Sequence, residues 1–120
     1  MSQTLGQDIF DAEGLLERMM GDRELASEIL SEFILDLSTQ ILGLRQSILE
    51  GDEKRIVRQI HTIKGASANV GAKGLERLAR GAEMDRVETQ MDDAEAFVMH
   101  LVEQFDVFKN RVAEIGFMKD

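Results

Sequence analysis

Apolar residues recur every three or four positions over a long stretch of the first half of the chain. The members of this run are Leu25, Ile29, Leu30, Phe33, Ile34, Leu37, Ile41, Leu44 and Ile48. Because an α-helix completes a turn in about 3.6 residues, this spacing places the run on one face of a long helix and predicts a buried stripe. Asp22 is a suitable N-cap for that helix, and Gly51 is a suitable residue to follow its end.

The same spacing predicts further helices on both sides of this one. A short helix is expected from Ala12 to about Met20, with Asp11 before it and Gly21 after it. A helix capped by Asp52 and followed by Gly71 would bury Ile56, Ile60, Ile63, Ser67 and Val70. The next would run from about Lys73 to Thr89 and bury Leu75, Leu78, Ala79 and Ala82. The last would open at Asp92 or Asp93, end before Gly116 and bury Phe97, Val98, Leu101, Phe105, Phe108, Val112 and Ile115.

These segments predict an all-α protein. The chain has no proline, and alternation with the period of two that is typical of strands occurs at no useful length. Short connections between helices favour antiparallel neighbours. We therefore expect an antiparallel up-down-up-down four-helix bundle with a short additional N-terminal helix that caps one end. A chain of 120 residues is one domain, 1–120, with its core at about 8–116.

Composition removes several function classes. Without cysteine there is no disulfide framework, thiol nucleophile, zinc knuckle or iron–sulfur cluster. No apolar run approaches the roughly 20 residues needed to span a bilayer, and the first ten residues do not resemble a secretion signal. We therefore expect a cytoplasmic protein that has no membrane partner, and the initial Met and short ends favour a separate chain. A net charge of −9 argues against nucleic-acid binding, which needs a basic surface.

The charge is unevenly distributed. Residues 52–80 carry seven basic and three acidic side chains, a local charge of +4, so the rest of the chain carries −13. The seven bases are Lys54, Arg55, Arg58, Lys64, Lys73, Arg77 and Arg80. An acidic protein with one basic stretch is therefore a feature that any function has to explain.

Few of the residues suit enzyme chemistry. The chain has only two histidines, His61 and His100, and neither has the Glu three positions earlier that a di-iron bundle requires. The nucleotide, hydrolase and metalloprotease motifs GxxxxGK[ST], GxGxxG, GxSxG and HExxH do not occur. We therefore expect no metal or cofactor of its own. We interpret His100 as a surface or boundary residue.

His61 has a more informative position. It lies away from the predicted buried face of its helix, so the imidazole should be accessible to solvent. Lys64 lies one turn further on, and Gly65 leaves the neighbouring surface without a side chain. An imidazole is a good nucleophile near neutral pH, and a cation beside it can stabilise a transferred anion. This setting suits phosphoryl transfer onto histidine, although an ordinary surface His beside a surface Lys has the same spacing.

The residues around His61 resemble a known family. Residues 61–72, HTIKGASANVGA, resemble the histidine-containing phosphotransfer (HPt) domain, whose pattern is H-x-x-K-G followed by small residues, an apolar residue and Gly-Ala. Residues 10–33, the pair Gly74-Leu75 and the position of Glu83 also fit, so the resemblance covers about residues 8–116. The chain departs from the family at Ala82, where Leu is more common, and this puts the local packing in doubt.

The resemblance implies a phosphorelay intermediate in two-component signalling, which is not an enzyme with its own ATP site. His61 would accept the phosphoryl group, Lys64 would offset its charge, Gly65 would leave room for the partner and Glu83 would orient the imidazole. The implied partners are response-regulator receiver domains, which supply Mg²⁺, and a sensor or hybrid histidine kinase. The expected contact residues are Lys54, Val57, Arg58, Ala68, Ala72 and Lys73, and the expected state is a monomer.

Two alternatives stay open at the level of sequence. One is the phosphoacceptor domain of a chemotaxis-type histidine kinase. The other is a helical bundle that binds a receiver without any phosphotransfer, in which His61 has no chemical role.

Overall fold

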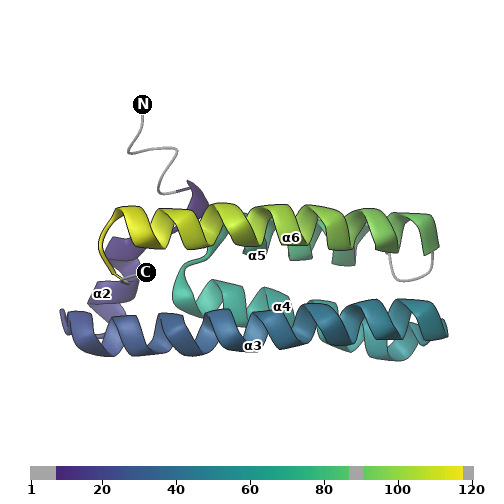
Figure 1. Ribbon diagram of the computed structural model, residues 1–120, viewed down its shortest axis with the longest axis horizontal. Helices are drawn as coiled ribbons and strands as arrows, with labels where there is room; N and C mark the ends of the chain where they lie inside the picture. Colours follow the sequence, from purple (N-terminus) through teal and green to yellow (C-terminus); the bar gives the residue numbers. More distant parts are fainter. Residues whose placement is uncertain (1–7, 87–90, 118–120) are drawn as a thin grey trace.

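The computed structural model describes residues 8–86 and 91–117, and this part of the chain contains helices and no strand (Figure 1). The helices are α2 (Ala12–Arg18), α3 (Arg23–Glu50), α4 (Glu53–Val70), α5 (Lys73–Asp85) and α6 (Met91–Glu114). The prediction of an all-helical protein is therefore confirmed. None of these helices combines the length and the apolar character needed to cross a membrane.

The predicted capping residues hold the helix starts. The carboxylates of Asp11, Asp22 and Asp52 each accept a hydrogen bond from the backbone N–H three residues later, over 3.0, 3.0 and 3.2 Å. Gly51 and Gly71 follow α3 and α4 in the left-handed conformation, with φ of 69° and 80°. These local signals fix the limits of α3 and α4 because a short polar side chain satisfies free N–H groups and glycine accepts positive φ without strain.

Three other helix limits differ from the predictions. α2 ends at Arg18 and not near Met20, because Met20 itself has a positive φ of 56°. α5 ends at Asp85 and not at Thr89, because Arg86 adopts the left-handed conformation with φ of 55°. The predicted end at Thr89 lies outside the described residues. α6 begins at Met91, one residue before the earlier of the two predicted starts.

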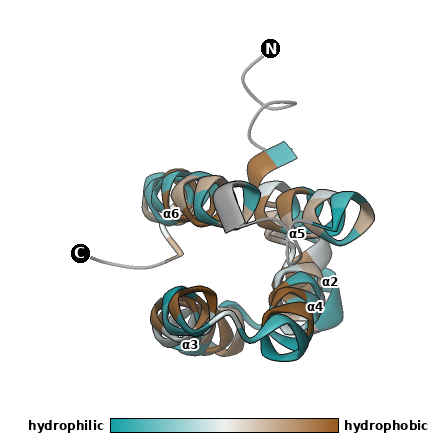
Figure 2. Cartoon of the chain, turned by 90° about the vertical axis from the view of Figure 1, so that its right-hand side faces the viewer, coloured by the Kyte–Doolittle hydropathy of each residue, from teal (hydrophilic) through white to brown (hydrophobic). Residues whose placement is uncertain are grey.

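The four longer helices surround one hydrophobic core. α4 packs against α3 and α5, and α6 packs against α5 and α3. Seen along the bundle, α3 and α6 form one side and α4 and α5 form the other (Figure 2). Side chains at the centre that are at most 1% exposed include Leu30, Leu44, Ile60, Ile63, Leu75, Leu101 and Phe108.

The predicted stripe of α3 is buried from Leu30 onward, with Ile34 half-buried, but Leu25 is exposed. The end of α4 lies beside residues 29–36 of α3, where Ile29 and Phe33 share a surface hollow with Ala66 and Val70. The first turn of α3 therefore extends beyond α4, and nothing on α4 covers Leu25.

Helix α2 closes one end of the bundle, as predicted. The N–H of Asp11 donates to the carbonyl oxygen of Gly71 over 2.8 Å, and the Arg18 guanidinium donates to the carbonyl oxygen of Asn69 over 2.9 Å. Phe10 packs edge-on against Phe108, with ring centroids 5.4 Å apart. The segment before α2 thereby holds the turn between α4 and α5.

Candidate functional site

The imidazole of His61 faces solvent from the middle of α4. Its side chain is 69% exposed, whereas the neighbouring Ile60 and Ile63 are at most 1% exposed. This change from buried to exposed follows from the 100° rotation between successive residues of a helix. Because positions 60 and 63 face the core, position 61 faces outward. A reactive group is therefore presented on a rigid element.

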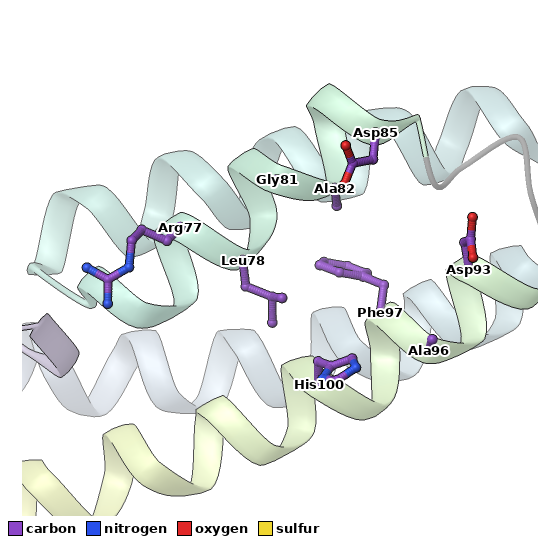
Figure 3. A pocket seen from close by; sticks show the side chains of 9 residues that line it. All are labelled: Arg77, Leu78, Gly81, Ala82, Asp85, Asp93, Ala96, Phe97 and His100. Atoms are coloured by element: carbon purple, nitrogen blue, oxygen red, sulfur yellow. The ribbon is translucent and has the colours of Figure 1, made fainter.

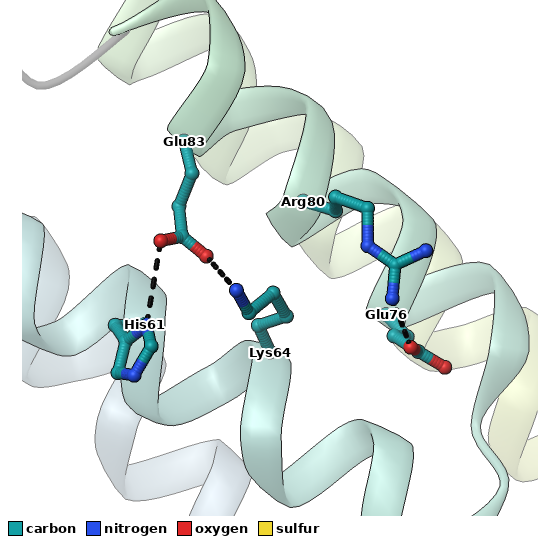
Figure 4. Close-up of polar contacts among 5 residues, drawn as sticks. All are labelled: His61, Lys64, Glu76, Arg80 and Glu83. Carbon is teal, nitrogen blue, oxygen red and sulfur yellow. Dashed lines mark hydrogen bonds and ion pairs between the residues drawn. The ribbon is translucent and has the colours of Figure 1, made fainter.

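Glu83 of α5 contacts the inner nitrogen of this ring. Its Oε2 atom lies 3.3 Å from Nδ1 of His61 (Figure 4). A carboxylate can only accept a hydrogen bond, so Nδ1 is the atom that carries the proton in this contact. The lone pair of the neutral ring then resides on Nε2, the other ring nitrogen.

The second oxygen of the same carboxylate holds Lys64. The ammonium nitrogen lies 2.7 Å from Oε1 of Glu83, and both side chains are more than two-thirds buried. One carboxylate on α5 thus engages two side chains that lie one turn apart on α4 (Figure 4). The family resemblance implied Glu83 as a partner of His61, but the ion pair with Lys64 was not predicted.

The pKa of Glu83 lies below its ordinary value of 4.5. The main cause is hydrogen bonding from Lys64, and the contact with His61 adds to it, while partial burial of the carboxyl opposes both. Glu83 is therefore ionised at neutral pH. An ionised carboxylate favours the Nδ1–H form of His61 and would stabilise positive charge that develops on the ring.

The surface beside His61 is bare at Gly65. This residue is exposed, and a Cβ atom built on it would meet no other atom within 4 Å. The residue lies one helical turn after His61, so an approaching molecule meets backbone there and no side chain.

Five of the six expected contact residues lie on the surface. Lys54, Val57, Arg58 and Ala68 are exposed along α4, and Lys73 is exposed at the start of α5. The prediction for Ala72 is wrong, because this residue is 0% exposed. It is the N-cap of α5, and its N–H donates to the carbonyl oxygen of Ser67 over 2.8 Å. The chain turns inward there and cannot offer the Ala72 side chain to a partner.

His100 occupies a different surface, the groove between α5 and α6 (Figure 3). A pocket of about 440 Å³ lies there, with Leu78 and Phe97 in its floor. Arg77 lines the same pocket, but its guanidinium donates to the carbonyl oxygen of Asp8 over 2.7 Å. Within residues 8–86 and 91–117, no group of three or more His, Asp or Glu side chains is arranged to hold a metal ion. None of His61, Lys64 and Glu83 lines this pocket.

Comparison with known proteins places the chain in a family. The Hpt domain model matches residues 28–115, a range that contains His61, Lys64, Gly65 and Glu83, and the chain belongs to this family. It is 27% identical over 101 residues to the phosphorelay intermediate protein rdeA of Dictyostelium discoideum. That alignment covers 83% of this chain and only 40% of the relative, so the chain spans less than half of the relative's length.

A solved structure has the same fold. The HPT domain of a hybrid sensor histidine kinase from Shewanella superposes with a TM-score of 0.71 and 19% identity. The superposition covers 91% of this chain and 94% of that domain. The likeness extends over the whole bundle and not only over the segment around His61.

Proposed function

We propose that the chain is a phosphorelay intermediate that accepts a phosphoryl group on His61 and exchanges it with the aspartate of a receiver domain. The observation that carries the proposal is the contact of Glu83 with Nδ1 of His61, which leaves Nε2 as an exposed nucleophile. Membership of the Hpt family and the similarity to a named phosphorelay intermediate support it. They favour it over the kinase-domain and binding-only alternatives.

The transfer step needs no proton to leave the site. The lone pair of Nε2 attacks the phosphorus of an aspartyl phosphate, the N–P bond forms, and the P–O bond to the aspartate breaks. The aspartate leaves as a carboxylate with the electron pair of that bond. The ring becomes cationic with its proton still on Nδ1, where the Glu83 carboxylate offsets the charge. The reverse step returns the phosphoryl group to a receiver aspartate.

Lys64 and Gly65 would assist this exchange in different ways. The Lys64 ammonium lies beside Glu83, whose carboxylate contacts Nδ1, so it would turn from Glu83 toward the phosphoryl oxygens on Nε2 and offset their charge there. Gly65 would allow the receiver to approach closely. Mg²⁺ and most of the transition-state stabilisation would belong to the receiver, so this chain would act as a carrier without an ATP or metal site.

The exposed bases around His61 would guide docking. Lys54 and Arg58 are exposed on α4 and Lys73 is exposed at the start of α5, with Val57 and Ala68 as smaller apolar contacts. Receiver active sites are clusters of carboxylates, so a basic face on an acidic body would select the orientation in which the partner binds. A sensor or hybrid histidine kinase is the expected phosphoryl source. The same role implies a cytoplasmic location, where such a kinase draws on ATP.

The four longer helices would follow the up-down-up-down order of a four-helix bundle. Their short connections support this order, as does the packing of each helix against its neighbours in the chain. The order would place His61 and Glu83 side by side on the α4–α5 side of the bundle.

The test is phosphoryl transfer from a phosphorylated receiver domain. The wild-type chain should gain acid-labile, base-stable phosphate, and His61→Gln should gain none. His100→Gln is the matched control, because His100 is also exposed but lies in the groove between α5 and α6. Absence of labelling with every receiver tried, or equal labelling of His61→Gln, would overturn the proposal.

A further inference from the structure

Three leucines of α3 are exposed at intervals of seven residues. Leu35, Leu42 and Leu49 are 72%, 68% and 78% exposed, although leucine is among the residues most often buried. A repeat of seven keeps side chains on nearly the same face of a helix, which is the spacing of a coiled-coil seam. We call these three residues the leucine stripe. The core of the bundle does not use them.

The leucine stripe continues into an apolar hollow shared with α6. Leu49 and Met99, which is 64% exposed, both line a surface pocket of about 340 Å³. The full lining is Arg45, Ile48, Leu49, Glu95, Val98 and Met99. This side of the bundle is formed by α3 and α6, opposite to the α4–α5 side that carries His61 (Figure 2). Whatever covers it would leave the phosphotransfer site accessible.

We propose that the leucine stripe and this hollow form the interface of a weak, reversible dimer of the chain. The stripe is symmetric, because Leu42 has a leucine seven residues before it and another seven residues after it. A second copy related by a twofold axis can therefore match leucine with leucine in either direction of the helix. Such self-matching is the property that a twofold interface requires.

The charges on this face fit a second copy in spite of the net charge of −9. Residues 37–49, LSTQILGLRQSIL, contain one charged side chain, Arg45, whereas 31% of the whole chain is charged. The hollow carries one charge of each sign, Arg45 and Glu95. Each copy can therefore offer its Arg45 to the Glu95 of the other.

The size of the face fits a weak dimer. The leucine stripe runs over 14 residues, about 21 Å of helix, so across the 24 Å width of the molecule it offers about 500 Å². A standard interface buries about 800 Å² on each partner. Among the described residues of α3 and α6, the large apolar groups that are more than half exposed are the leucine stripe and Met99, and so few favour a reversible contact. In such a dimer the two His61 sites would lie on opposite outer faces, so two receivers could bind at once. The monomer that was expected from the sequence would then be the state of the chain at low concentration.

Sedimentation velocity over a wide range of concentration tests the association. The wild-type sedimentation coefficient should rise with concentration, and Leu42→Glu should weaken the dimer at least about tenfold, because it would bury a charge at the centre of the interface. Met84→Glu is the control, since Met84 is 78% exposed on α5 and lies off the stripe. Circular dichroism should show equal helicity in all three proteins, since both substitutions are at exposed positions.

Cysteine cross-linking gives a second readout, because the natural chain contains no cysteine. Leu42→Cys should form a disulfide-linked dimer under mild oxidation much faster than Met84→Cys. Leu35→Cys mixed with Leu49→Cys should cross-link if the two α3 helices are antiparallel, and each alone should cross-link if they are parallel. The proposal is overturned if the wild type stays monomeric into the millimolar range, or if Leu42→Cys cross-links no faster than Met84→Cys. These outcomes do not depend on phosphotransfer.

Discussion

The Lys64 ammonium and the Glu83 carboxylate form a 2.7 Å ion pair that joins α4 to α5 beside the exposed imidazole. The same carboxylate also contacts Nδ1 of His61, so the cation that is expected to meet the phosphoryl group is held close to the ring but on the side of Glu83. The Glu83 carboxylate partly neutralises the charge of the Lys64 ammonium until a phosphoryl group binds. In the proposed function, Lys64 changes partner while the backbone stays in position.

Replacing Lys64 with Ala should slow transfer from a phosphorylated receiver by roughly ten- to a hundredfold, less than the loss of a fully buried oxyanion donor. Lys64→Arg should retain part of the rate because it keeps the charge. Single-turnover transfer kinetics measure both variants, and circular dichroism reports the fold. Transfer by Lys64→Ala at the wild-type rate would remove Lys64 from the mechanism, and a large loss of helicity would show that Lys64 has a structural role.

The stability of the chain should depend on pH through Glu83. Its pKa is lowered in the folded state, so its contribution to the free energy of unfolding is present above the ordinary value of 4.5 and disappears as pH falls through the folded value. Glu83→Gln should therefore be less stable than the wild type at pH 7, by at most about 1 kcal/mol for a partly exposed pair. The difference should vanish at acidic pH, where Glu83 is protonated in both the folded and the unfolded state.

Urea unfolding at both pH values measures this effect. Glu103→Gln, on an exposed position of α6, provides the correction for removing one negative charge from an acidic protein. If the free energy of unfolding of Glu83→Gln is lower than that of the wild type by the same amount at neutral and at acidic pH, the ionised Glu83 carboxylate is not the cause of the difference.

Substitutions at Gly65 should separate docking from chemistry. Gly65→Ala should raise the free energy of unfolding by about 1 kcal/mol, because alanine is a better helix former and its Cβ meets open space. Gly65→Leu should fold equally well but lose most of the transfer from a receiver. Labelling of His61 by a small donor such as phosphoramidate should be nearly unchanged. Equal losses with both donors would show that the larger side chain disturbs His61 itself.

Gly71→Ala should destabilise the fold more than Gly51→Ala. Both glycines have positive φ, so each substitution incurs a backbone cost of about 1 kcal/mol. At Gly71 the new Cβ would also lie 2.9 Å from the carbonyl oxygen of Asp11, whereas at Gly51 it would meet nothing within 4 Å. Thermal or urea unfolding of the two variants measures the difference. Equal losses would show that α2 can move away from the turn without cost.

Local signals allowed much of this structure to be predicted from the sequence. The Asp residues at positions 11, 22 and 52 cap helix starts through hydrogen bonds to backbone N–H groups three residues later. The glycines at 51 and 71 end helices through their own positive φ angles. The outward position of His61 follows from the periodicity of the buried residues around it. The resemblance around residues 61–72 added the position of Glu83, which no local pattern indicates.

The features that were not predicted depend on how the helices pack. Ala72 is small and lies next to exposed residues in the sequence, but the turn between α4 and α5 carries it into the core. Leu25 fits the helical stripe but lies beyond the end of α4. The ion pair of Lys64 and Glu83 could be predicted only if the placement of α4 relative to α5 were known. The positions of residues along each helix do not define that placement.

The turn at Gly71 sets which residues of α4 and α5 meet. His61 lies ten residues before Gly71 and Glu83 lies twelve after it, so the two meet only when both arms of the hairpin keep their lengths. One residue inserted in either arm would rotate the more distant side chain by about 100° and shift it by about 1.5 Å along its helix. The spacing to this glycine is thus a criterion for finding the same histidine–carboxylate pair in other sequences, even where the residues between them have diverged.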